Sequence, residues 1–140
     1  MADDVSAELL TAQVAKRLLP VRAGDANKGS FGRTLIEGGS RNYVGALLLA
    51  ARAAVRSGSG LVFVASSEPV YRLIAGRVEE AIYLPLAASE SGDLALREAS
   101  LELLSQMCDM NSVLIGPGFG QSASTVQFVE QIDAAEVVAP

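Results

Sequence analysis

Two short segments rich in glycine contain the residue types best suited to bind a phosphorylated ligand. The first, Gly38-Gly39-Ser40, follows a short run at 34–37 and precedes an alanine- and leucine-rich stretch that begins at Gly45. Adjacent glycines let backbone N–H groups approach a ligand closely, and the first turn of a helix adds unpaired donors and the positive end of its dipole. The segment therefore predicts an anion-binding turn, and the alternative is an ordinary loop after a strand.

The second segment, Gly116-Pro117-Gly118-Phe119-Gly120, repeats this design after an apolar run at 112–115. Ligands of open α/β sheets bind outside the carboxyl ends of the strands, so two such loops predict one shared crevice. The first segment lacks the dinucleotide-binding spacing, and neither segment ends in the Gly-Lys-Ser/Thr of a phosphate-binding P-loop. Two tight turns without a ligand remain the alternative.

The residues that are missing limit the chemistry of this stretch. The sequence contains no histidine and a single cysteine, Cys108. It therefore cannot supply a Ser-His-Asp or Cys-His nucleophile, a His-ligated metal or an intramolecular disulfide. Lys28, next to Gly29 and just ahead of the first predicted strand, is a further candidate ligand-binding residue, and a solvated loop lysine is its alternative.

Composition restricts the class of protein and its partners. Half of the 140 residues are apolar, which is enough for the core of one domain at most. The 11 basic and 16 acidic residues give a net charge of −5, which argues against nucleic acid or an anionic membrane as the main partner. The acidic start of the chain does not resemble a secretory signal, and the apolar stretch 43–55 is interrupted by Arg52. We therefore expect a cytoplasmic protein without a membrane span.

Strands and helices are expected to alternate, which predicts an α/β fold with a parallel sheet. The predicted strands are 34–37, 61–65, 81–84, which we expect Pro85 to end, and 112–115. The run 61–65 shows no polar alternation, so both of its faces should be buried.

Five helices are predicted between and around these strands. A first helix at 12–19, capped by Thr11, should pack through Val14, Leu18 and Leu19. The helix 45–57 is almost wholly apolar and should be covered on most of its circumference. Later helices should run from Ser66 or Ser67 to Gly76, from about Leu94 to Met107 with Leu101, Leu103 and Leu104 toward the core, and from about Ser122.

Several motifs together resemble the ADP- or ATP-dependent NAD(P)H-hydrate dehydratases. They are Lys28-Gly29-x-Phe31-Gly32, Gly38-Gly39-Ser40, Tyr43-x-Gly45-Ala46 with the run 50–62, and Ile115-Gly116-Pro117-Gly118-Phe119-Gly120. The resemblance implies a ribokinase-like three-layer sandwich with a mainly parallel sheet. It also implies a nucleotide-repair lyase that dehydrates hydrated NADH or NADPH (NADHX or NADPHX) at the expense of ADP or ATP, with Mg²⁺, often as a tetramer.

By position, the resemblance implies that Ala46 and Gly118 line the site of the hydrated cofactor. Gly45, Gly116 and the Gly38-Gly39-Ser40 turn would surround them, and Lys28 with Gly29 would match the lead-in, where Asn27 replaces the usual histidine. No catalytic residue and no metal ligand is assigned, because the family's Asp-Ala-Asp strand, His-Pro segment and terminal Gly-Asp loop are not found.

We therefore expect residues 1–140 to be the amino-terminal portion of a single ribokinase-like domain, cut before its later strands and inactive alone. Two alternatives stay open: a ribokinase-type small-molecule kinase acting on a vitamin precursor, and a non-catalytic nucleotide-binding module.

Overall fold

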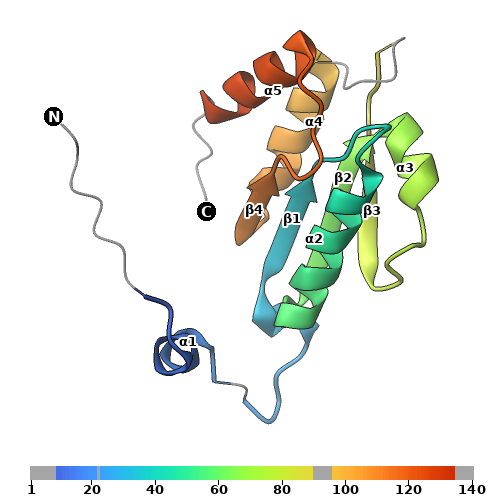
Figure 1. Cartoon of the computed structure of the whole chain (residues 1–140). Coiled ribbons are helices and arrows are strands. Elements are labelled where there is room, and N and C mark those ends of the chain that lie inside the picture. Colours follow the sequence, from blue (N-terminus) through green and yellow to red (C-terminus); the bar gives the residue numbers. More distant parts are fainter. Residues whose placement is uncertain (1–8, 22, 90–95, 135–140) are drawn as a thin grey trace, which may run out of the picture.

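Helices and strands alternate along most of the chain (Figure 1), which confirms the predicted α/β class. The structure is a computed structural model and describes residues 9–21, 23–89 and 96–134. Its elements are α1 Ala12–Leu18, the 3₁₀ turn η1 Lys28–Phe31, β1 Arg33–Glu37, α2 Val44–Ser57, β2 Leu61–Ser67, α3 Glu68–Ile74, β3 Ala81–Leu86, α4 Leu96–Met107, β4 Ser112–Ile115 and α5 Ala123–Asp133.

All strand pairs of the four-stranded sheet are parallel, and the strand order is β3-β2-β1-β4. The chain moves outward from β1 through β2 to β3 and then returns to the other side of β1 to form β4. The direction of travel through the sheet therefore reverses between β1 and β4. In open α/β sheets, the crevice outside the carboxyl ends of the strands at such a reversal is where ligands bind.

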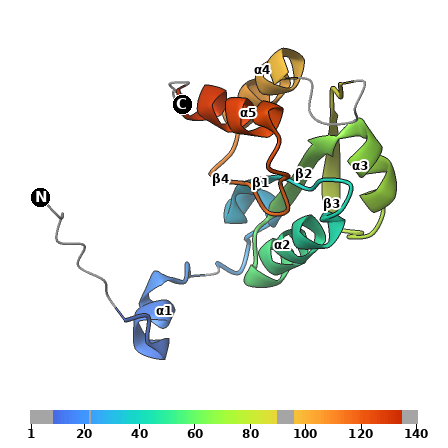
Figure 2. The same ribbon diagram turned by 45° about the horizontal axis from the view of Figure 1, so that its top comes forward.

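Helices cover both faces of the sheet and make a three-layer arrangement (Figure 2), as predicted. On one face, the core joins Ile36 of β1 to Leu47 of α2 and Ile74 of α3. On the other face, Leu35 packs with residues of α4 and α5, including Phe128. The alternation of Leu35 and Ile36 between two apolar layers explains why β1 reads as an unbroken apolar run.

Two strands extend further toward their carboxyl ends than predicted. β2 continues to Ser67, and the hydroxyl of Ser66, which is buried, donates to the carbonyl of Gly38 at 2.6 Å. This bond satisfies a polar group inside the sheet, so a serine does not end the strand. β3 also continues through Pro85, which was wrongly expected to end it. A proline is tolerated there because β3 is an edge strand and needs ladder hydrogen bonds on one side only.

The packing predicted for helix α1 is wrong. Thr11 caps the helix as expected, but α1 has no buried residue, and Leu18 and Leu19 are 73% and 64% exposed. Figure 1 shows α1 standing apart from the sheet. A helix of seven residues has room for only one or two apolar contacts on a face, and here none of them meets the core.

Two further expectations about helix faces are wrong. Within α2 only Leu47 and Ala51 are buried, whereas Leu49 is 68% exposed, so the helix is covered on one face rather than most of its circumference. In α4, Leu103 is buried but Leu101 is 62% exposed. Residues two apart lie on opposite sides of a helix, so Leu101 and Leu103 cannot both face the core.

The start expected for α4, at Leu94, lies outside the described residues. Within the part of the chain that is described, no helix combines the length and apolar character needed to cross a bilayer.

Candidate cofactor-binding site

The two glycine loops meet at the carboxyl edge of β1 and β4, as predicted. The Gly39 N–H donates to the Pro117 carbonyl at 2.9 Å, and the Gly116 N–H donates to the Glu37 carbonyl at 3.0 Å. The hydroxyl of Ser40 donates to the carbonyl of Gly118 at 2.9 Å. Residues far apart in the sequence are thus tied into one structure at the top of the sheet in Figure 1.

The loops approach each other so closely that side chains would separate them. A Cβ atom added at Gly38 would clash with the carbonyl of Pro117, and one added at Gly118 would clash with the carbonyl of Tyr43. Gly118 also has φ +80°, a backbone conformation that residues with a Cβ rarely adopt. Glycine is therefore required at both positions by the packing of the loops.

A hollow of about 560 Å³ opens beside this junction. Its lining residues come from the start of α2 and from the second loop: Tyr43, Ala46, Gly118, Phe119, Gly120 and Gln121. Ala46 and Gly118, which the motifs predicted as ligand-lining residues, thus contribute to the same cavity. The small residues give it space, while Tyr43, which is 60% exposed, offers an aromatic surface at its edge.

Hydrogen-bond donors at this hollow come from helix α2 rather than from the first glycine turn. The N–H groups of Gly38 and Gly39 are already donated to carbonyls within the protein. The N-cap residue of α2, Tyr43, provides no side-chain acceptor for the first turn of the helix, and that turn contains no acidic residue. The amino end of α2 therefore keeps the donors and partial positive charge that favour an anion.

Helix α5 differs, although its amino end was also expected to point at a ligand. The Ser122 hydroxyl accepts from the Thr125 N–H at 3.3 Å, so the helix is capped by its own sequence. Of the two helix starts, α2 is the one left without a side-chain cap.

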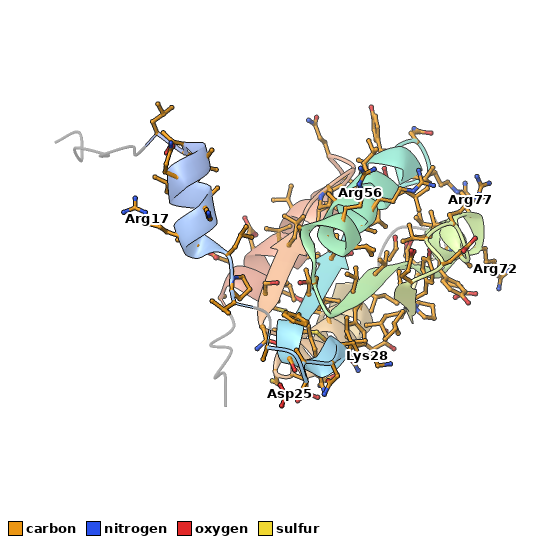
Figure 3. All side chains as sticks on the ribbon, turned by 90° about the horizontal axis from the view of Figure 1, so that it is seen from below. Arg17, Asp25, Lys28, Arg56, Arg72 and Arg77 are labelled. Atoms are coloured by element: carbon orange, nitrogen blue, oxygen red, sulfur yellow. The ribbon has the colours of Figure 1, made fainter. Side chains whose placement is uncertain are left out.

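The other predicted site residues are Gly45, Gly116 and Lys28. Gly45 lies in the first turn of α2 with open space where a Cβ would be, and Gly116 begins the second loop with φ +113°. Lys28 belongs to η1, before the amino end of β1, and its carbonyl faces Gly60 just ahead of β2. Figure 3, viewed from below, shows Lys28 near that end of the sheet. The structure therefore does not bring Lys28 together with the glycine loops.

The described lining does not fit a Mg²⁺ site by itself. Mg²⁺ prefers oxygen ligands and is held in proteins by carboxylates together with water or phosphate. The hollow offers the phenol of Tyr43 and the amide of Gln121 but no carboxylate. Among the residues described, no group of three or more His, Cys, Asp or Glu side chains could hold a metal ion. This arrangement can bind and orient a ligand, and no step of chemistry is assigned to it.

One residue beside the junction was not predicted as functional. Glu37, the last residue of β1, is completely buried, and neither of its carboxyl oxygens has a hydrogen-bond partner. Burial raises the pKa of this carboxyl well above its usual value. The position of Glu37 in the sequence already indicated its burial. A strand without polar alternation is predicted to be buried on both faces, and Glu37 is the last residue of such a strand.

Comparison with known proteins identifies the family. The pattern of the NAD(P)H-hydrate dehydratase family matches residues 34–138. A bifunctional NAD(P)H-hydrate repair enzyme of Moorella thermoacetica is 36% identical over 124 residues, which cover 89% of this chain and 23% of the relative. An ADP-dependent (S)-NAD(P)H-hydrate dehydratase of Lactiplantibacillus plantarum is 30% identical over 126 residues, which cover 90% of this chain and 41% of the relative.

Solved structures support the same family assignment. A ribokinase-like superfamily protein of Enterococcus faecalis superimposes with a TM-score of 0.70 at 26% identity, covering 88% of this chain and 39% of that one. The ADP/ATP-dependent NAD(P)H-hydrate dehydratase of Bacillus subtilis, co-crystallized with ATP and Mg²⁺, gives a TM-score of 0.64 at 30% identity, covering 90% and 42%.

The chain thus spans less than half the length of the relatives and structures that it matches. Within that span, the family pattern includes both glycine loops and the start of α2. The chain belongs to the NAD(P)H-hydrate dehydratase family.

Proposed function

We propose that this chain forms the cofactor-binding part of a dehydratase that converts NADHX or NADPHX to NADH or NADPH at the expense of ADP or ATP. Its family membership and the names of its relatives support this activity. In this proposal the protein acts in the cytoplasm as a homo-oligomer, and residues 1–140 belong to one ribokinase-like domain. In the same proposal its ligand is a small nucleotide, and neither a nucleic acid nor a membrane is its partner.

The observation that supports the proposal best is the meeting of Ala46 and Gly118 on one hollow at the reversal of strand order. The family resemblance implied that these two positions line the site of the hydrated cofactor. Tyr43 and Phe119 provide aromatic surface for a flat ring, and aromatic groups stack favourably on one another. The uncapped first turn of α2 provides donors for a phosphate of the same ligand.

Binding of ADP or ATP and of Mg²⁺ is not part of the role proposed for the described residues. A related dehydratase was crystallized with ATP and Mg²⁺, which supports a nucleotide and a metal in the family's reaction. The metal would supply charge stabilisation at the transferred phosphate. We assign no described residue of this chain to either group. The role proposed for the described residues is to bind and orient the hydrated cofactor.

The test is binding of NADPH, which shares nearly all of its structure with the hydrated substrate, measured by titration calorimetry on the 140-residue chain. In the variant Ala46→Leu, a larger side chain enters the hollow. We expect the affinity for NADPH to fall at least about tenfold, which corresponds to a loss of about 1.4 kcal/mol or more in binding free energy. Ala53→Leu, on an exposed position of the same helix, is the matched control and should leave affinity unchanged.

Circular dichroism of both variants shows whether α2 is retained. If the unmodified chain does not bind NADPH, or if Ala46→Leu binds it as well as Ala53→Leu does, the proposed site is wrong.

A further inference from the structure

The buried carboxyl of Glu37 lies on the face of the sheet that helices α4 and α5 cover. Leu35, two residues earlier in β1, belongs to the apolar cluster on that face, and side chains two apart in a strand point the same way. The register partners of Glu37 are Ala65 in β2 and Ile115 in β4, which pack in the same cluster. Glu37 is thus an acidic residue in an apolar layer.

Among the residues that the structure describes, no charged group compensates for this burial. The described charged side chains of the elements packed around that face are all exposed, and none forms an ion pair or hydrogen bond with Glu37. They are Arg41 of the loop after β1, Glu102 of α4, and Glu130 and Asp133 of α5. An ionised carboxylate in such a place loses its hydration without gaining a partner, so the uncharged acid is favoured. Burial accordingly raises the pKa of Glu37.

The backbone around Glu37 is also the junction of the two glycine loops. The carbonyl of Glu37 accepts the Gly116 N–H at 3.0 Å, and the next residue, Gly38, donates to Ala65 at 3.2 Å. One residue further, the Gly39 N–H donates to Pro117 at 2.9 Å. An ionised Glu37 side chain can reach water only if the end of β1 is displaced, and this displacement would break the bonds that hold the loops together.

We propose that Glu37 is a positioning residue for the cofactor hollow: uncharged, it keeps the carboxyl end of β1 packed and the two glycine loops joined, and ionised, it releases that junction. The junction itself does not depend on the proposed function, whereas the effect on the cofactor does. Because the charged form is the disfavoured one, release should grow as pH rises through the raised pKa of Glu37.

Amide hydrogen exchange, measured by NMR on the 140-residue chain between about pH 6 and about pH 9, tests the proposal at the two loop-joining amides, Gly39 and Gly116. In the unmodified chain, the protection factors of these amides should fall by up to about tenfold per pH unit between the usual carboxyl pKa of 4.5 and the raised pKa of Glu37, and should level off above the raised pKa. Glu37→Gln, which cannot ionise, should give protection factors that do not change with pH. Glu130→Gln, at an exposed glutamate of α5, is the matched control and should behave like the unmodified chain.

Equal pH responses in the unmodified chain and in Glu37→Gln, including no response in either, would overturn the proposal. If Glu37→Gln does not fold, Glu37→Leu replaces the uncharged acid by an apolar side chain of similar size and must show the same pH-independent protection. NADPH titrations of the same proteins at about pH 7 and about pH 9 separate this proposal from the function. A difference in hydrogen exchange without any NADPH binding would contradict only the cofactor assignment, while loss of binding at high pH in the unmodified chain alone would support both.

Discussion

Glu37 is a titratable residue at the end of a buried, largely apolar strand. Above the usual carboxyl pKa of 4.5, the unfolded chain releases the Glu37 proton while the folded chain retains it. The folded state then binds more protons than the unfolded state, so the free energy of unfolding decreases as pH rises toward the raised pKa.

We therefore predict that Glu37→Gln is more stable than the unmodified chain at neutral and alkaline pH, by an amount that increases with pH. One proton limits the slope to about 1.4 kcal/mol per pH unit. Urea unfolding at several pH values measures the difference. A gap that stays constant or narrows between acidic and alkaline pH would contradict the prediction.

Gly118 is the residue where backbone conformation and loop packing impose the same requirement. Gly118→Ala would place a Cβ against the carbonyl of Tyr43 at a φ of +80°, and a left-handed conformation alone costs about 1–3 kcal/mol for most residues. We predict a loss of at least that size in the free energy of unfolding, measured by chemical denaturation. Gly120→Ala, in the same loop but with open space around the added Cβ, is the control and should cost less than about 1 kcal/mol.

The sequence was sufficient to predict that the two glycine loops and the start of α2 meet, but not which of the other predicted residues lie near them. Ala46, Gly118 and Ser40 meet as expected because each follows or faces the carboxyl end of a strand. Lys28 does not join them because it precedes a strand instead, and a parallel sheet separates its two ends by the length of its strands. Glu37 was placed correctly in the predicted strand 34–37, but no function was predicted for it, because the sequence does not show whether a glutamate at the end of a buried strand has a partner.

At the scale of elements, periodicity predicted which segments form helices and strands more reliably than which faces they bury. Strand β1 and helix α2 were located nearly to the residue, because glycines bound them. The outer faces of α1, α2 and α4 could not be predicted in the same way, because an apolar side chain on a helix needs a partner that the sequence of the helix does not specify.

The contrast between α1 and α2 gives a test at this scale. Leu18→Ala removes a side chain that is 73% exposed in α1 and should change the free energy of unfolding by no more than about 0.5 kcal/mol. Leu47→Ala removes a fully buried side chain between α2 and the sheet and should cost about 2–5 kcal/mol. Thermal and urea unfolding of the two variants compare them directly. Similar losses in both would mean that α1 packs on the domain in solution.

At the scale of the molecule, the strand order places β1 between β2 and β4, and its carboxyl end between the two loops. Among the described residues, the fourth strand, β4, pairs only with β1, and it has two partly exposed apolar residues, Val113 at 37% and Leu114 at 46%. Such a strand resembles the interior of a larger parallel sheet more than a protected edge, since edge strands usually have charges, bulges or a cover. This agrees with relatives that are more than twice as long as the matched span.

The distribution of groups around the hollow leads to the last prediction. Tyr43 is the only titratable side chain that lines it among the described residues, and phosphoryl transfer depends on positioned metal and charged groups around the phosphate. We therefore predict that the purified 140-residue chain binds NADPH but does not convert NADHX to NADH when ADP or ATP and Mg²⁺ are supplied. Absorbance at the wavelength of NADH follows the reaction, with the Bacillus subtilis dehydratase as the positive control. Turnover by this chain above that of an Ala46→Leu preparation would refute the prediction and would place catalytic groups within these 140 residues.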